Sequence, residues 1–78
     1  MSIPQPLTAK LLGQYIRKAR KTAGLTQVDA AGLCGVSIPF FNSIENGKPT
    51  ARIDMVLYVC HQLGLNIHVE LPEELYDT

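Results

Sequence analysis

The stretch of sequence that decides the fold covers residues 24–48 and reads GLTQVDAAGLCGVSIPFFNSIENGK. Apolar residues recur at helical spacing over 27–33 and again over 38–45. Thr26 precedes the first segment and Ser37 precedes the second, and both residue types are favoured at helix N-caps. The stretch therefore predicts two short helices that follow each other closely.

The residues around the junction indicate how these two helices meet. Ala31 is small enough to let two helix backbones approach, and Gly35 falls at the turn, where a positive φ is needed. Val36, Phe41 and Ile44 then supply the apolar face of the second helix. The spacing Ala-x-x-x-Gly-Val-Ser with these apolar residues behind it is a helix-turn-helix pattern.

The flanking sequence predicts one longer helix on each side of this pattern. Thr8 can cap a helix over 9–23, and Thr50 can cap a helix over 51–63. The second of these helices carries an apolar stripe that we expect to be buried, made of Ile53, Val56, Leu57, Cys60 and Leu63.

The hydrophobic period changes from helical to alternating after residue 64, which predicts a β-strand over 65–71. Its apolar face consists of Leu65, Ile67, Val69 and Leu71. A lone strand leaves backbone N–H and C=O groups unpaired, so we expect it to pair with the same strand of a second copy in a homodimer. The alternative is a strand packed loosely on its own helices.

The length of 78 residues fits one small domain. We divide the chain into an N-terminal arm (1–7), a helix-turn-helix domain (8–64), a dimerisation strand (65–71) and an acidic tail (72–78). A core of this size supplies only about 3–5 kcal/mol of stability, so we expect a second subunit to add to it. The length also leaves little room for an enclosed substrate pocket.

The formal net charge is zero, but the charges are unevenly distributed along the chain. Residues 1–52 hold all seven Lys and Arg with only Asp29 and Glu45 as acids, whereas residues 53–78 hold five acids and no Lys or Arg. This polarity indicates a basic working face and a separate acidic face. The alternative is a solvated surface that meets no partner.

Other classes of protein find little support in the sequence. No apolar run approaches the roughly 18 residues that cross a membrane, and no signal peptide is recognisable, so we expect a cytoplasmic protein. Cys34, Cys60, His61 and His68 lack the spacing of metal ligands, and no catalytic triad or phosphate loop is present. We therefore expect no cofactor, no metal site and no enzymatic activity. Whether His68 makes a dimer pH-sensitive stays open.

Two short motifs resemble the XRE family of Cro and lambda-type repressors. These are Gly-Leu-Thr-Gln at residues 24–27 and Ile-Glu-Asn-Gly-Lys at residues 44–48, and the resemblance covers residues 12–63. It implies an all-α, lambda-repressor-like fold of about four helices that binds double-stranded DNA and regulates transcription.

The later sequence is similar to HipB-type antitoxins within that family. Its features are Gly-Lys-Pro-Thr-Ala-Arg at residues 47–52, a helix, Leu-Gly-Leu at residues 63–65 and then a strand. The resemblance implies a C-terminal β-strand that pairs across a homodimer, repression of a palindromic operator in its own operon, and binding of a HipA-type kinase toxin. Two alternatives stay open, a stand-alone XRE-type regulator and a protein-interaction module that has kept the fold.

The resemblance also assigns roles to particular residues. The helix over 38–45 is expected in the major groove, with base-facing positions at Ser37, Ile38, Pro39, Asn42 and Ser43. Phosphate contacts are expected from Thr26, Gln27, Asn46, Lys48, Arg17, Lys21 and Arg52. Arg20 is expected to pair with Glu45 and so to tie the first helix to the third.

Overall fold

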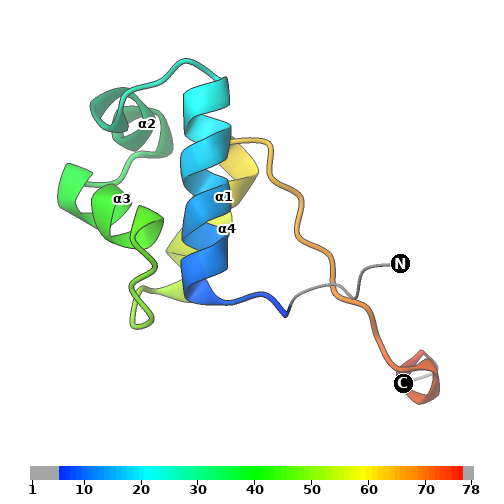
Figure 1. The fold of residues 1–78 in the computed structure, drawn as a ribbon. Helices are drawn as coiled ribbons and strands as arrows, with labels where there is room; N and C mark the ends of the chain where they lie inside the picture. Colours follow the sequence, from blue (N-terminus) through cyan, green and yellow to red (C-terminus); the bar gives the residue numbers. More distant parts are fainter. Residues whose placement is uncertain (1–5, 77–78) are drawn as a thin grey trace.

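The computed structural model describes residues 6–76 and contains four α-helices and one 3-10 turn within them (Figure 1). They are α1 (Ala9–Thr22), α2 (Gln27–Cys34), α3 (Ile38–Glu45), α4 (Ile53–Gln62) and η1 (Glu73–Leu75). Most of the predicted arm, residues 1–5, and the last two residues of the predicted acidic tail lie outside the described residues. The predicted all-α fold of four helices is confirmed.

Three of the four helices begin at the predicted caps. The side chains of Thr8 and Ser37 accept hydrogen bonds from the backbone N–H groups of Leu11 (3.0 Å) and Phe40 (3.1 Å). Thr26 forms a capping box with Asp29, in which each side chain accepts from the other residue's backbone N–H. Such caps satisfy first-turn donors that have no partner inside the helix.

The predicted start of the fourth helix is wrong by two residues. Helix α4 begins at Ile53 rather than at residue 51, and Arg52 rather than Thr50 occupies the N-cap position without a side-chain cap. The reason lies in the preceding turn, where the N–H of Ala51 donates to the carbonyl of Lys48. Pro49 is the second residue of that turn, a position its fixed φ favours, so Thr50 lies in the turn and cannot cap a helix.

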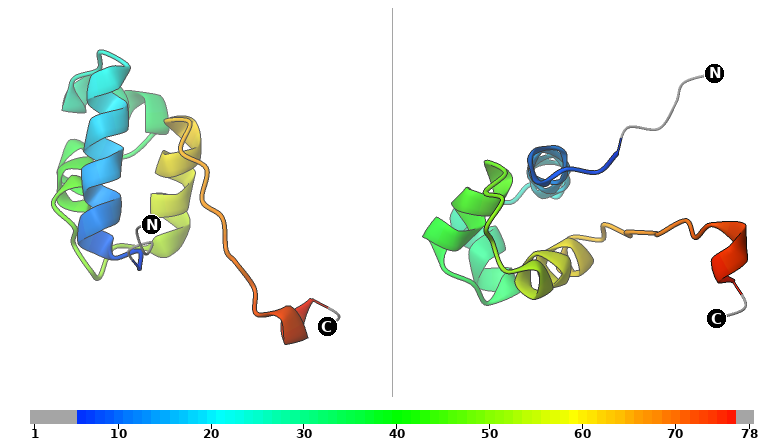
Figure 2. Two further views of the ribbon diagram at one scale, coloured as in Figure 1. Left: turned by 45° about the vertical axis from the view of Figure 1, so that its right-hand side comes forward. Right: turned by 90° about the horizontal axis from the view of Figure 1, so that it is seen from below.

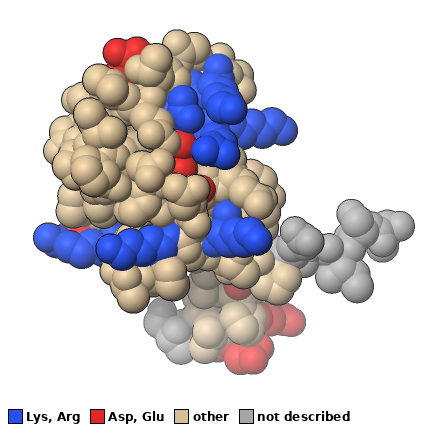
Figure 3. Space-filling model, turned by 60° about the vertical axis from the view of Figure 1, so that its left-hand side comes forward, with Lys and Arg blue, Asp and Glu red and all other residues tan. Residues whose placement is uncertain are grey.

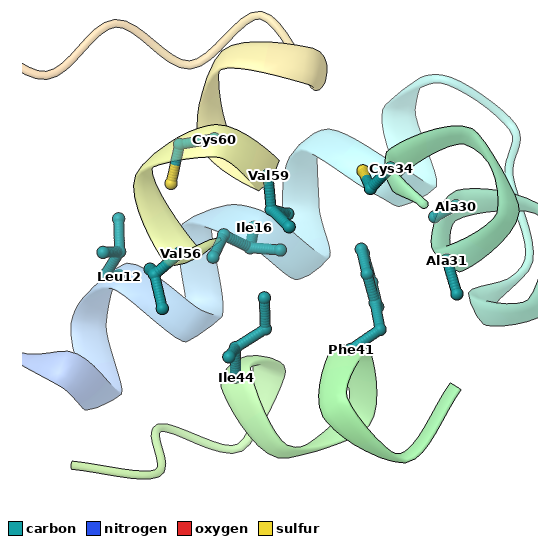
Figure 4. Close-up of a cluster of buried hydrophobic side chains, with 10 residues drawn as sticks. All are labelled: Leu12, Ile16, Ala30, Ala31, Cys34, Phe41, Ile44, Val56, Val59 and Cys60. Carbon is teal, nitrogen blue, oxygen red and sulfur yellow. The ribbon is translucent and has the colours of Figure 1, made fainter. Parts of the chain in front are cut away.

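The core lies between all four helices, and Figure 4 shows side chains from each of them converging there. Phe41, Ile16, Val59 and Cys60 are its largest fully buried side chains. The predicted stripe of α4 is only partly correct, because Val56 and Cys60 are buried whereas Ile53 and Leu57 are exposed. Helix α4 therefore keeps apolar side chains on its outer surface.

Two glycines allow α1 to lie directly against the end of α3. A Cβ on Gly13 would come within 2.6 Å of the Glu45 carbonyl oxygen. Gly47 has a φ of +78°, and a Cβ there would come within 2.6 Å of the Lys10 Cα. The first position requires a residue without a side chain for steric reasons, and the second for both steric and conformational reasons.

The β-strand predicted over 65–71 is not formed in the single chain. Residues 65–72 are without regular secondary structure and lead away from the helices to η1 (Figures 1 and 2). Leu65 still packs against the core, and its N–H donates to the Cys60 carbonyl at 2.8 Å. Among residues 6–76 no strand lies beside this segment, and a strand needs such a partner for its backbone hydrogen bonds.

Within the described residues, none of the helices has the length and apolar character needed to cross a membrane.

Candidate nucleic-acid interface

The turn between α2 and α3 has the predicted geometry. Gly35 ends α2 in the left-handed conformation with φ of 67°, and the N–H of Val36 donates to the Ala31 carbonyl at 3.0 Å. Ala30 and Ala31 are fully buried against the rest of the core, as a close approach of helices requires. The turn leaves the N-terminus of α2 and the outer side of α3 on one face of the molecule (Figure 1).

A buried ion pair joins α1 to α3. The Arg20 guanidinium donates two hydrogen bonds to the Glu45 carboxylate, from Nε to Oε2 at 2.5 Å and from Nη2 to Oε1 at 3.2 Å. A third donor, Nη1, reaches the Leu25 carbonyl at 2.9 Å. The predicted Arg20–Glu45 contact is therefore present, and its two parallel hydrogen bonds fix the direction of both side chains.

Glu45 has two further partners that the sequence reasoning missed. The Gln27 Nε2 group donates to Oε1 at 2.8 Å, and Arg17 Nε lies 3.6 Å from the same oxygen. Burial alone would raise the pKa of Glu45, but the hydrogen bonds from Arg20 and Gln27 and the charges of Arg20 and Arg17 together lower it. The hydrogen bonds that Arg20 donates to Glu45 in turn raise the pKa of Arg20, so both groups stay ionised near neutral pH.

The base-facing residues predicted on α3 lie together on its exposed side, with different freedom to form new bonds. Ile38 is 45% exposed, and Pro39 and Asn42 are also exposed. Ser37 accepts the cap hydrogen bond and keeps its own proton available. Ser43 is half-buried and already donates to the Phe40 carbonyl at 2.7 Å, so only its acceptor capacity remains.

Gln27, which is expected at phosphate, uses both of its side-chain donors inside the protein. One hydrogen of its Nε2 group goes to Glu45, and the other goes to Asn42 Oδ1 at 3.1 Å. A carboxamide has two N–H donors, so both are used inside the protein. No signal in the sequence indicated this contact, because it joins residues fifteen positions apart in the chain.

The remaining residues expected at phosphate differ in their surroundings. Thr26 is the N-cap of α2. Asn46 is the C-cap of α3, and its Nδ2 group donates to the Asn42 carbonyl at 2.9 Å. Lys21 and Lys48 are exposed, and the Arg17 side chain is 51% exposed. Arg52 donates to Asp54 at 3.1 and 2.6 Å, so its charge is already balanced and the pKa of Asp54 is lowered.

Lys and Arg side chains gather in two groups on the face that carries α2 and α3 (Figure 3). The two groups lie above and below a largely uncharged surface in that view. Such an arrangement can hold two stretches of phosphate backbone while neutral side chains between them meet base edges.

Candidate metal ligands and reactive thiols are the other groups to consider within residues 6–76. The described residues contain no cluster of three or more His, Cys, Asp or Glu side chains able to hold a metal ion. Cys34 and Cys60 are buried free thiols, and burial raises the pKa of each. A raised pKa makes a thiol a poor nucleophile at neutral pH.

Comparisons with known proteins agree with this geometry. Residues 11–73 match the family model described as a helix-turn-helix domain. The chain is 41% identical over 63 residues to y4mF, an HTH-type transcriptional regulator of Sinorhizobium fredii (strain NBRC 101917 / NGR234). The matched residues make up 81% of this chain and 83% of that protein.

Solved structures give the same picture. The clp gene regulator ClgR from C. glutamicum is 29% identical, with a TM-score of 0.68 over 85% of each chain. HipB in two 20mer complexes, O2 and O4, is 17% and 15% identical, with a TM-score of 0.75 in both. The HipB matches cover 92% and 91% of this chain and the whole of the HipB chain, and at this identity they show a shared fold.

Proposed function

Because the chain belongs to the XRE-type helix-turn-helix domain family of DNA-binding transcriptional regulators, we propose that it binds a palindromic operator as a homodimer and represses transcription. The family consists of DNA-binding proteins without enzymatic activity.

The observation that carries this proposal is the hydrogen-bonded network around Glu45. It links α1 through Arg20, α2 through Gln27 and α3 through Glu45 itself, so the three helices form one rigid unit. A rigid unit can place the exposed side of α3 in a major groove and keep its orientation fixed while other residues contact phosphate.

Specific contacts in this proposal come from the exposed side of α3. Ser37 and Asn42 offer hydrogen bonds to base edges, and Ile38 and Pro39 offer apolar contact to a thymine methyl group. Lys21 and Lys48 lie near opposite ends of α1 and contact phosphate. Because none of the base-facing positions is Lys or Arg, the bend and groove width of the DNA contribute to the choice of operator.

The homodimer is supported by apolar surface that the single chain leaves open. Leu57 on α4 and Ile67 and Val69 in the segment after it are exposed, and an apolar groove runs between α1 and residues 65–68. Exposed apolar residues in a continuous patch mark an interaction site. We propose that residues 65–71 of two copies pair as antiparallel strands and cover this surface.

We propose an antitoxin role as a second candidate function. It is supported by the likeness to HipB, whose whole chain is covered by the fold of this one. In this proposal the chain also binds a HipA-type kinase toxin, for which the acidic segment with Glu73 and Glu74 offers a contact separate from the basic face. The alternative is a stand-alone regulator with the same DNA-binding mode.

A mobility shift of the protein on the DNA upstream of its own gene tests the main proposal. We expect a discrete shifted band at low salt that survives an excess of unrelated DNA and weakens steeply as salt rises. No shift at low salt would refute DNA binding. Co-purification of a kinase-like protein with the tagged chain, and a further shift when it is added, would support the antitoxin role.

A further inference from the structure

The hydrogen bonds of Gln27 determine which atom of the Asn42 side chain can bind a partner. Gln27 Nε2 lies 2.8 Å from Glu45 Oε1 and 3.1 Å from Asn42 Oδ1. If the Gln27 amide turned over, its oxygen would face the buried carboxylate of Glu45, and two acceptors cannot share a hydrogen bond. The charge of Glu45 therefore determines which way the Gln27 amide points.

The Gln27 amide in turn orients the side chain of Asn42. Because Gln27 directs an N–H at Asn42, the oxygen of the Asn42 side chain is the atom that turns inward. The Nδ2 group of Asn42 then faces away from Gln27, and within residues 6–76 it has no acceptor. Asn42 is exposed on α3, so this donor lies on the face proposed to meet DNA.

We infer that Asn42 recognises a hydrogen-bond acceptor on DNA through its Nδ2 group. Gln27 is the positioning residue that turns this group outward, and Glu45 fixes the orientation of Gln27, so Asn42 donates to DNA and does not accept from it. The inference rests on the proposed function and adds to it the chemistry that one position of α3 selects. An acceptor of this kind is a purine N7, a guanine O6 or a thymine O4 in the major groove, or a phosphate oxygen. The exocyclic amino group of cytosine, a donor, is excluded.

The experiment starts from a DNA sequence selected by the wild-type protein from a randomised pool. In this duplex each acceptor is removed in turn: purine N7 by the 7-deaza analogue, guanine O6 by 2-aminopurine, thymine O4 by 5-methyl-2-pyrimidinone, and the charged phosphate oxygen by a methylphosphonate. The wild type is expected to lose affinity by about tenfold or more at one acceptor per half-site. A sensitive base analogue identifies a base atom as the acceptor, and a sensitive methylphosphonate identifies a phosphate.

Variants assign that acceptor to Asn42 and test the role of Gln27. Asn42→Ala should bind more weakly and become insensitive to the same replacement, as expected when the two partners of one contact are removed. Gln27→Met should lose most of the sensitivity as well, because Asn42 can then turn over. Gln14→Met, an exposed Gln to Met change on α1, is the matched control and should behave as wild type.

The outcomes separate the inference from the proposed function. If the wild type enriches no sequence and binds none at low salt, the proposed function fails and this inference fails with it. If the wild type binds but Asn42→Ala keeps the full pattern of sensitivity, the inference alone is overturned. Full sensitivity in a folded Gln27→Met variant would overturn the positioning role, and thermal unfolding followed by circular dichroism establishes that the variant is folded.

Discussion

At the scale of single residues, the contacts that hold α1 and α2 against α3 join positions far apart in the chain. The Arg20–Glu45 pair could be expected from a family resemblance, and it is present. The contact between Gln27 and Asn42 and the tight approach at Gly13 could not, because both depend on how α1 and α2 are placed against α3. Such placements follow from the packing of the whole core and leave no periodic signal.

Gly13 and Gly32 make a matched pair for testing the approach of α1 to α3. Gly13→Ala should lower the free energy of unfolding by about 1–3 kcal/mol, because its Cβ would meet backbone atoms of Ile44 and Glu45. Gly32→Ala should raise it by up to about 1 kcal/mol, since that helical position faces open space. Urea denaturation of both variants measures the difference, and equal effects would contradict the packing described here.

Glu45 should make stability depend on pH in a defined direction. Its pKa is lowered in the folded protein, so its contribution to stability is present above the unfolded-state value of about 4.5 and is lost as pH falls through the folded-state pKa. Wild type should therefore be more stable than Glu45→Gln at pH 7, and the gap should narrow as the pH approaches 3.

Urea denaturation at a series of pH values measures this gap. Glu74→Gln removes an exposed carboxylate and serves as the control, for which little change with pH is expected. A gap between wild type and Glu45→Gln that stays constant from pH 7 to pH 3 would show that the ionised carboxylate is not the stabilising species.

At the scale of elements, the starts of the three helices with local caps were predictable, and the start of α4 was not. The starts of α1, α2 and α3 follow from Thr8, Thr26 and Ser37, which bond to residues three positions on. The start of α4 depends instead on a turn at Pro49, and Thr50 is a good capping residue in an unsuitable place. A cap needs both the right side chain and an extended backbone at that position.

Threonine substitutions test this distinction. Thr26→Ala should destabilise the protein by about 1 kcal/mol, because it removes the hydroxyl oxygen that accepts from the Asp29 N–H at the start of α2. Thr50→Ala should change stability by less than about 0.5 kcal/mol, because no helix cap depends on it. The two values come from thermal or urea unfolding, and a larger effect at Thr50 would place the start of α4 at the originally predicted residue.

At the scale of the whole molecule, the zero net charge conceals two oppositely charged regions. The basic residues lie on and around the helix-turn-helix unit, whereas acids predominate after residue 52. The alternating segment 65–71 was predictable as a pattern, but its strand cannot form in one chain because it needs a partner. The assembly therefore stays a prediction drawn from exposed apolar surface.

The homodimer can be tested by changing one side of that segment. Val69 is 79% exposed in the single chain, so Val69→Lys should leave the fold intact while shifting the dimer towards monomer by tenfold or more, on the order of 1.4 kcal/mol. Asn66→Lys, on the other face of the segment, is the control and should have little effect. Sedimentation at micromolar concentration distinguishes the states, and a monomeric wild type would contradict the dimer.

A hydroxyl-radical footprint of the wild-type protein on the DNA upstream of its own gene tests the central claim most directly. A homodimer of helix-turn-helix units predicts two protected patches on one face of the duplex, separated by about 10–10.5 base pairs or a multiple of that spacing. The patches should contain the two halves of an inverted repeat. Protection of a single patch, or no protection at a concentration that saturates the mobility shift, would contradict the account.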